Sequence, residues 1–213
     1  MMDQLVKLSP EKRNVILQAG IDEFSQRAFT DANTDVITLA AGISKGLLFH
    51  YFGSKKTFYL YCLDVSLQRL VANSPVSAGT DFFDILFQMM DEKIRLCRDF
   101  PKETLMVNLA ARDASAAIHA EKLALFARYS AETTKVSRQL LSRAIAILPL
   151  KQPNNPKLQD ALMLYISAIN QKYLLQYRET PQLFFDHALE IQLEMRTYIN
   201  FMLEGIVSQE AEL

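Results

Sequence analysis

The sequence contains no tryptophan and little glycine or cysteine, with six glycines and two cysteines among 213 residues. Cys62 and Cys97 match neither a CxxC motif nor the spacing of paired metal ligands, and no secretory signal opens the chain. No apolar run reaches the roughly 18 residues that a membrane-spanning helix needs. We therefore expect a soluble, reduced protein of the cytoplasm that does not enter a membrane.

The sequence also lacks the motifs of known catalytic sites. Its three histidines, His50, His119 and His187, form no HExxH motif and lie near no plausible nucleophile and acid. Glycine-rich loops that cradle phosphate groups are absent as well. We expect a protein that is not an enzyme, with no catalytic residue, no metal site and no cofactor.

The residues that are present favour helices. Half of them are hydrophobic and the formal net charge is −1, so a sizeable core can form, while any basic surface must be local. Leucine, alanine, glutamine and lysine are common, whereas strand signals are few. We predict an all-α fold of about nine helices, spanning residues 10–27, 34–41, 45–51, 54–72, 82–98, 101–112, 115–148, 157–178 and 182–205.

The segment 34–55 predicts two short helices joined by a tight turn. Thr34 is the expected N-cap of the first helix, with Asn33 as the alternative. Gly42 ends this helix, because the residue after a helix often needs a positive φ, which glycine adopts without steric cost. Ser44 then caps the second helix. Two helices joined by a short turn that contains glycine are typical of a helix-turn-helix motif.

The charges of this segment favour DNA as its partner. No acidic residue lies between Asp35 and Asp64, whereas Lys45, Lys55 and Lys56 fall in the first turns of expected helices. A cation there is unfavourable by about 0.3–1 kcal/mol, because the helix dipole is positive at that end. Helix N-termini are also ready-made phosphate sites, so these lysines indicate an anionic partner. The alternative is that they are ordinary solvated lysines.

The segment 43–55, Ile-Ser-Lys-Gly-Leu-Leu-Phe-His-Tyr-Phe-Gly-Ser-Lys, resembles the core motif of the TetR/AcrR family of bacterial transcriptional regulators. The similarity runs without a gap over residues 12–63, and beyond it only the helical layout and the length match. The resemblance implies a helix-turn-helix DNA-binding domain over residues 1–55 and a helical effector-binding and dimerisation domain over residues 56–213. It usually implies repression that a small molecule relieves.

Carried over position by position, the DNA-contacting residues of the family correspond to Thr34, Ser44, Lys45, Gly46, Leu47, His50, Tyr51 and Lys55. The hydroxyl groups and Lys55 suit phosphate oxygens, which position a protein on DNA without reading its sequence. Lys45, Leu47 and His50 are expected in the major groove, where lysine meets guanine and leucine meets a thymine methyl. Gly46 lets the backbone approach closely.

Three positions depart from the family pattern. Phe49 stands where a phosphate-binding tyrosine is usual, which removes one expected backbone contact. Thr38 replaces a small alanine, and we expect its hydroxyl to bond back along its own helix. Leu47 replaces a common threonine, which puts a polar base contact there in doubt.

The C-terminal part is rich in aromatic residues and methionine at helical spacing, which is typical either of plain core or of an adaptable ligand pocket. Thr104, Asn108 and Arg112 form a polar line on an apolar helix and are either a solvated face or donors to a ligand. Asn170 needs a partner if it is buried, in a pocket or an interface. The candidate effector site consists of Phe87, Met90, Met106, Asn108, Arg112, Phe126, Tyr129 and Asn170.

The last two expected helices are apolar on two sides. In the first of them, Leu162 and Tyr173 belong to one stripe, and Leu164 and Leu175 to another. A helix that is apolar on two sides is buried on two sides, so one face should pack within the subunit and the other against a partner chain. This pattern predicts a homodimer joined by a four-helix bundle.

Together these features predict a sequence-specific DNA-binding regulator. A two-fold dimer suits palindromic double-stranded operator DNA. The expected function is repression, with release from the operator by a small apolar or amphipathic ligand. An effector-independent DNA-binding dimer and a transcriptional activator are the alternatives.

Overall fold

The computed structural model describes residues 8–72, 79–177 and 180–206. The chain forms two compact units, the first of residues 1–75 and 95–133, and the second of residues 76–94 and 134–213. Each unit has its own apolar core. The units do not follow a boundary at residue 55, and the functional division at that residue stays a prediction.

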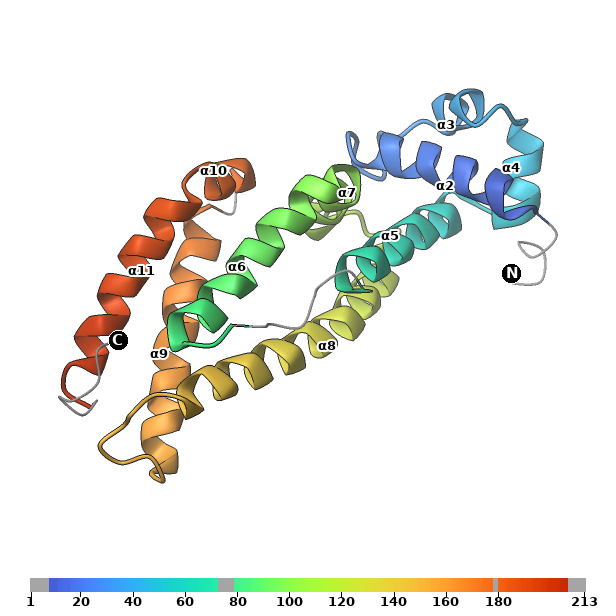
Figure 1. The fold of residues 1–213 in the computed structure, drawn as a ribbon. Coiled ribbons are helices and arrows are strands. Elements are labelled where there is room, and N and C mark those ends of the chain that lie inside the picture. Colours follow the sequence, from blue (N-terminus) through green and yellow to red (C-terminus); the bar gives the residue numbers. More distant parts are fainter. Residues whose placement is uncertain (1–7, 73–78, 178–179, 207–213) are drawn as a thin grey trace. The chain divides into compact units, whose positions relative to one another are not determined.

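The described residues fold into helices and connecting turns, and the predicted all-α class is confirmed. Figure 1 shows the helices in chain order: α2 (Pro10–Phe24), α3 (Thr34–Ala40), α4 (Lys45–Phe52), α5 (Lys55–Ala72), α6 (Phe82–Asp99), α7 (Pro101–Arg112), α8 (His119–Ala146), α9 (Pro156–Gln176), α10 (Pro181–Asp186) and α11 (Ala188–Leu203). Helices α6 and α8 contribute residues to both units. None of the helices in the described ranges is both long enough and apolar enough to cross a membrane.

Helix α2 starts as predicted but ends earlier. Ser9 Oγ accepts the Lys12 backbone N–H at 3.3 Å, and proline occupies the first helical position, where its missing N–H costs nothing. The helix ends at Phe24 rather than at residue 27. The reason is Ser25, whose hydroxyl donates to the Asp22 carbonyl at 2.8 Å and so satisfies the acceptor that a further helical N–H would have used.

Two later helices also differ from the prediction. Helix α8 begins at His119 instead of residue 115, because the Ser115 N–H is held by the Asp113 carboxylate, 2.8 Å away, in a turn before the helix. The helix expected over residues 182–205 is two helices, α10 and α11, separated at His187, whose φ and ψ of −99° and 15° are not helical. The described part of the chain therefore holds one helix more than predicted.

Aromatic side chains form the centre of the first unit, where α2 meets α5. The Phe24 ring centroid lies 4.9 Å from that of Tyr59, and Phe52 of α4 lies 4.5 Å from Phe58 of α5. All four rings are buried. The two helices approach closely because Gly20 has no side chain: a Cβ there would lie 2.5 Å from Phe58 Cζ. The motif helices thus rest on a closely packed core.

The second unit buries the apolar side chains of α6 against the end of α8, α9 and α11. On α9, the stripe that contains Leu162 and Tyr173 is buried, whereas Leu164 and Leu175 are exposed. One apolar face of α9 is therefore covered within the chain, as predicted, and the other is not.

Candidate DNA-binding site

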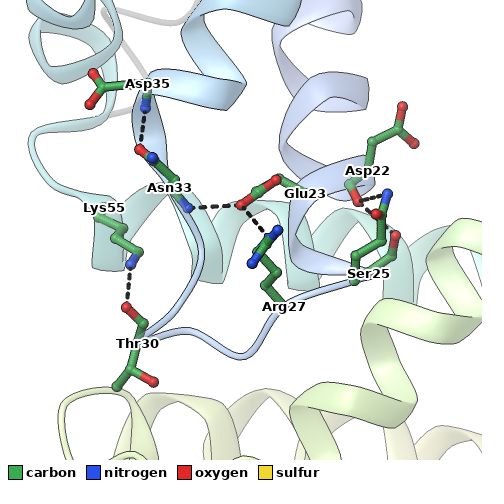
Figure 2. A network of polar contacts seen from close by, with 9 residues as sticks. Asp22, Glu23, Ser25, Arg27, Thr30, Asn33, Asp35 and Lys55 are labelled. Atoms are coloured by element: carbon green, nitrogen blue, oxygen red, sulfur yellow. Dashed lines mark hydrogen bonds and ion pairs between the residues drawn. The ribbon is translucent and has the colours of Figure 1, made fainter.

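The motif begins at α3, whose N-cap is Asn33 and not the predicted Thr34. Asn33 Oδ1 accepts the Asp35 backbone N–H at 2.8 Å, whereas Thr34 is the first helical residue and is only 8% exposed. The buried carboxylate of Glu23 holds this arrangement, because its Oε1 accepts the Asn33 backbone N–H at 2.8 Å (Figure 2). Arg27 Nε lies 3.5 Å from the same oxygen. Glu23 therefore fixes the backbone at the start of the motif, and little of Thr34 is accessible.

The turn after α3 has the predicted backbone. Gly42 has a φ of 62°, the left-handed region that glycine adopts without strain. The Ile43 N–H returns to the Thr38 carbonyl at 3.0 Å and closes the turn. The Thr38 hydroxyl donates to the Asp35 carbonyl at 3.1 Å, which confirms its predicted bond back along its own helix. The helix-turn-helix geometry is therefore present.

Both ends of α4 and the start of α5 are capped, and Ser44 is the cap of α4 as predicted. Ser44 Oγ accepts the Leu47 N–H at 3.2 Å, and Gly53, with a φ of 74°, ends α4. Ser54 Oγ accepts the Thr57 N–H at 3.1 Å at the start of α5. Each cap satisfies backbone donors that the first turn of a helix leaves unpaired. The two helix starts that carry Lys45 and Lys55 are thus well defined.

One side of helix α4 packs into the core of the first unit, and the other side is accessible to solvent. Leu48 and Phe52 are buried in the core of the first unit. The remaining candidate residues lie outside this stripe: Ser44, Lys45, Gly46 and His50 are exposed, and Leu47 and Tyr51 are half-buried. The His50 and Tyr51 rings meet edge to face at 5.2 Å. The structure therefore gathers the candidate residues of α4 on its accessible side.

Lys45 is paired with a protein carboxylate. Its Nζ lies 3.0 Å from Asp35 Oδ1 and 3.1 Å from Asp35 Oδ2, so the pair joins the first turns of α3 and α4. Both side chains are exposed, and such a pair contributes about 0–1 kcal/mol to stability because water screens it. An ion pair this weak can give way to a phosphate or a guanine.

Lys55 is held by the loop between α2 and α3. Its Nζ donates to the Thr30 carbonyl at 3.1 Å, as Figure 2 shows, and lies 5.1 Å from the Phe29 ring centroid. Burial lowers the pKa of this ammonium group, and the nearby carboxylates of Asp31 and Glu23 oppose that effect. Because an ammonium group has three donors, a phosphate can still bind Lys55 while the Thr30 contact remains.

Sequence reasoning missed the groups that hold the three lysines. Asp35 precedes Lys45 by ten residues, and only the turn at Gly42 brings the two together. Lys56 Nζ lies 2.5 Å from Glu121 Oε1 of α8, a partner that no sequence pattern indicates. The three lysines that indicated an anionic partner are thus each engaged with protein groups in this structure.

The candidate effector residues do not form one site within either unit. Phe87 and Met90 belong to the core of the second unit, and Asn170 of the same unit is exposed. The others belong to the first unit, namely Met106, Asn108, Arg112, Phe126 and Tyr129. Met106 is fully buried and accepts the Ser66 hydroxyl at 3.7 Å, which makes it a core residue of that unit.

A groove of about 420 Å³ lies in the second unit, between α6 and α11. It is lined by Gly79, Phe83, Asp84, Phe87, Gln88, Asp91, Gln192 and Arg196. The Phe83 and Phe87 rings are stacked at 5.7 Å, and the Arg196 guanidinium lies 4.0 Å from the Phe83 centroid. Its combination of aromatic faces and charges suits an amphipathic molecule. No cluster of three or more metal-binding side chains occurs in the part of the chain that the structure describes.

Comparison with known proteins agrees with this geometry. Residues 16–62 match the family described as bacterial regulatory proteins, tetR family. The HTH-type transcriptional regulators RutR of Escherichia coli (strain K12) and Shigella flexneri are each 33% identical to this chain over 94 residues. That match covers 43% of this chain and only 43% of the length of each of these curated relatives.

Solved structures share the fold of the whole chain. A TetR family transcriptional regulator from Chloroflexus aurantiacus J-10-FL is 20% identical, with 97% of this chain and 98% of that chain covered and a TM-score of 0.57. A transcriptional regulator from Rhodococcus sp. Rha1 is also 20% identical, with 93% and 98% covered and a TM-score of 0.59. At these identities the likeness concerns the fold alone.

The fold and the site define an all-helical protein with an N-terminal helix-turn-helix. The N-terminal segment 16–62 matches the TetR family of bacterial regulatory proteins, which confirms the resemblance inferred from residues 43–55.

Proposed function

We propose that this protein is a dimeric repressor that binds palindromic operator DNA and is released by a small apolar or amphipathic ligand. The observation that carries the DNA-binding role is the accessible side of α4, bounded by Gly42 and Gly53, with Lys45 in the first turn. In this proposal, Lys45 and His50 read base edges in the major groove. Ser44, Tyr51 and Lys55 contact phosphates and set the orientation.

An uncovered apolar face supports dimerisation. It consists of Leu164 and Leu175 on α9 and Leu189, Leu193 and Phe201 on α11, each between 58% and 76% exposed. The two helices are adjacent, since the Tyr165 hydroxyl donates to the Tyr198 carbonyl at 2.9 Å. Exposed apolar surface of this kind is usually covered by a partner, and a second copy covers it in a two-fold arrangement. Such a dimer places its two recognition helices on half-sites about 34–36 Å apart or a multiple of that distance.

Release by a ligand is supported by the packing of α5, which carries Lys55 at its first residue. Along α5, Arg69 Nη1 lies 2.6 Å from Glu103 Oε1 of α7, and Glu103 is buried. A ligand that displaces α7 would therefore displace α5 and change the separation of the recognition helices in the dimer. A tenfold loss of operator affinity requires that the ligand favour the displaced state by about 1.4 kcal/mol.

In vitro selection from a pool of randomised DNA duplexes tests the proposed function, because the pool itself supplies the candidate operator sequences. Sequencing of the bound fraction should reveal an inverted repeat, and sedimentation should show two chains on each recovered duplex. The proposal fails if the selection enriches no sequence, or if sedimentation shows a stable monomer at micromolar concentration. Hydrophobic compounds that raise the melting temperature and weaken binding of the recovered duplex would identify the ligand class.

Lys55→Ala should weaken binding to the recovered and the scrambled duplex alike. Loss of a phosphate contact releases fewer counterions, so the slope of log affinity against log salt should become shallower by about 1 for each half-site. Titrations at several salt concentrations measure this slope. Lys157→Ala, an exposed lysine on α9 of the second unit, is the control and should leave the slope unchanged. A changed base preference in Lys55→Ala would contradict the assigned role.

Asp35→Asn should tighten binding to DNA roughly twofold to fivefold at low salt. The change removes a charge that repels phosphates and frees Lys45; a unit charge about 8 Å from one phosphate is worth about 0.5 kcal/mol in water. The melting temperature should hardly change, because the pair is exposed. Anisotropy titrations and thermal melts provide the two measurements. Weaker binding by the variant would show that Asp35 instead orients Lys45 for the complex.

A further inference from the structure

The loop between α2 and α3, which holds Lys55, is itself anchored from a distant part of the chain. The Phe29 backbone N–H donates to Asp113 Oδ2 at 2.8 Å, across 84 residues of sequence. Asp113 is the C-cap of α7 and lies outside residues 16–62, the segment that matches the family. Both partners belong to the first compact unit.

Asp113 is in turn held from several sides. Its backbone N–H donates to the Leu109 carbonyl at 3.1 Å, and its Oδ1 accepts the Ser115 N–H at 2.8 Å. Its carbonyl accepts a hydrogen bond from the ammonium group of Lys122, a lysine that is almost fully buried. These hydrogen bonds restrict the position of the carboxylate that accepts the Phe29 N–H.

Two contacts connect the segment that Asp113 holds, Phe29 and Thr30, to Lys55. The Phe29 ring lies 5.1 Å from Lys55 Nζ, and the carbonyl of the next residue, Thr30, accepts a hydrogen bond from the same atom at 3.1 Å (Figure 2). The Phe29 ring also meets the buried Tyr59 ring edge to face at 5.3 Å. The long side chain of Lys55 is thus held beside Phe29 and Thr30.

We propose that Asp113 is a positioning residue for DNA binding: through Phe29 and Thr30 it holds Lys55 in the place from which Lys55 contacts a phosphate. The inference rests on the proposed phosphate contact of Lys55. Restricting Lys55 in advance lowers the entropy lost when the complex forms, which is the general benefit of preorganisation. The DNA-binding site of this chain therefore includes a residue from the α7–α8 corner.

Asp113→Ala tests the inference by titration of the selected duplex. We expect binding to weaken roughly threefold to tenfold, the range set by freeing one long side chain, with base preference unchanged. Removal of a negative charge would by itself tighten binding to DNA, so the expected sign separates positioning from net charge. Asp22→Ala is the matched control, because it removes the same charge from α2 without a contact to Phe29 or Lys55.

A double-mutant cycle with Lys55→Ala gives the decisive readout. If Asp113 acts through Lys55, Asp113→Ala adds nothing in the Lys55→Ala background, whereas a general loss of structure lowers affinity in both backgrounds. Asp113→Asn keeps one carbonyl oxygen for two backbone donors, the N–H groups of Phe29 and Ser115. It should therefore lose less binding than Asp113→Ala, and it serves as the second variant if the alanine variant folds poorly. Additive effects, or unchanged binding by Asp113→Ala, overturn the inference. If Lys55→Ala itself binds like the wild type, it is the proposed phosphate contact that fails.

Discussion

Replacing Leu189 and Leu193 together by glutamate is expected to convert the protein into a monomer and to lower its affinity for the recovered duplex about 10²–10⁴-fold, the gain that bivalent binding usually brings. Both leucines are exposed on α11 in the single chain, so glutamate should not disturb the subunit. In the proposed dimer they become buried, and two buried, unpaired charges are strongly unfavourable. Sedimentation velocity and duplex titration measure the two effects.

The control for this substitution is Val136→Glu, at an exposed apolar residue of α8 in the same unit. It adds the same charge without touching the uncovered face of α9 and α11, and should remain a dimer with wild-type affinity. A Leu189→Glu, Leu193→Glu variant that stays dimeric would mean that the chain does not dimerise through α11.

The second large effect concerns the packing of α2 on α5. Gly20→Ala should lower the free energy of unfolding by about 1–3 kcal/mol, the usual cost of overpacking a filled core. A Cβ at this position would lie 2.5 Å from Phe58 Cζ and 2.8 Å from Cys62 Sγ, and both side chains are fully buried, so the core has to repack to admit it. The melting temperature should fall by roughly 2–12 °C. A variant as stable as the wild type would show that the helices separate at little cost.

Gly46→Ala replaces a glycine in the same way, but it is expected to affect DNA binding and not to destabilise the fold. A Cβ there meets only Ser44 Oγ, at 3.9 Å, and Gly46 lies within α4, where alanine favours the helix by about 1 kcal/mol. We expect higher stability but at least tenfold weaker binding of the recovered duplex, because the methyl group lies where the backbone is proposed to approach DNA. Unchanged DNA binding in this variant would place the recognition surface elsewhere. Thermal melts and titrations of both glycine variants therefore separate folding from recognition.

Local sequence patterns predicted the motif because local chemistry determines it. Gly42 has the positive φ expected of it, and Ser44 caps α4 as expected. The choice between Thr34 and Asn33 could not be made in this way, since both residue types are good caps. It depends on the buried Glu23, which binds the Asn33 backbone from another helix.

Tertiary contacts were beyond the reach of periodicity. The apolar spacing of α6, α7 and α8 did not indicate which helix faces share a core, and the candidate effector residues are divided between two units. The contact of Phe29 with Asp113 spans 84 residues and involves a backbone donor, for which a sequence carries no signal.

Repeating the duplex selection with Lys45→Ala and with Lys55→Ala tests directly whether α4 reads the bases while the start of α5 contacts the DNA backbone. Each good base contact is worth about 1–3 kcal/mol of discrimination, so its loss should be visible as a relaxed position in the recovered sequence. We expect Lys45→Ala to recover an inverted repeat with relaxed preference at one position of each half-site, and Lys55→Ala to recover the wild-type sequence with lower affinity. A changed sequence from Lys55→Ala together with an unchanged one from Lys45→Ala would contradict this expectation.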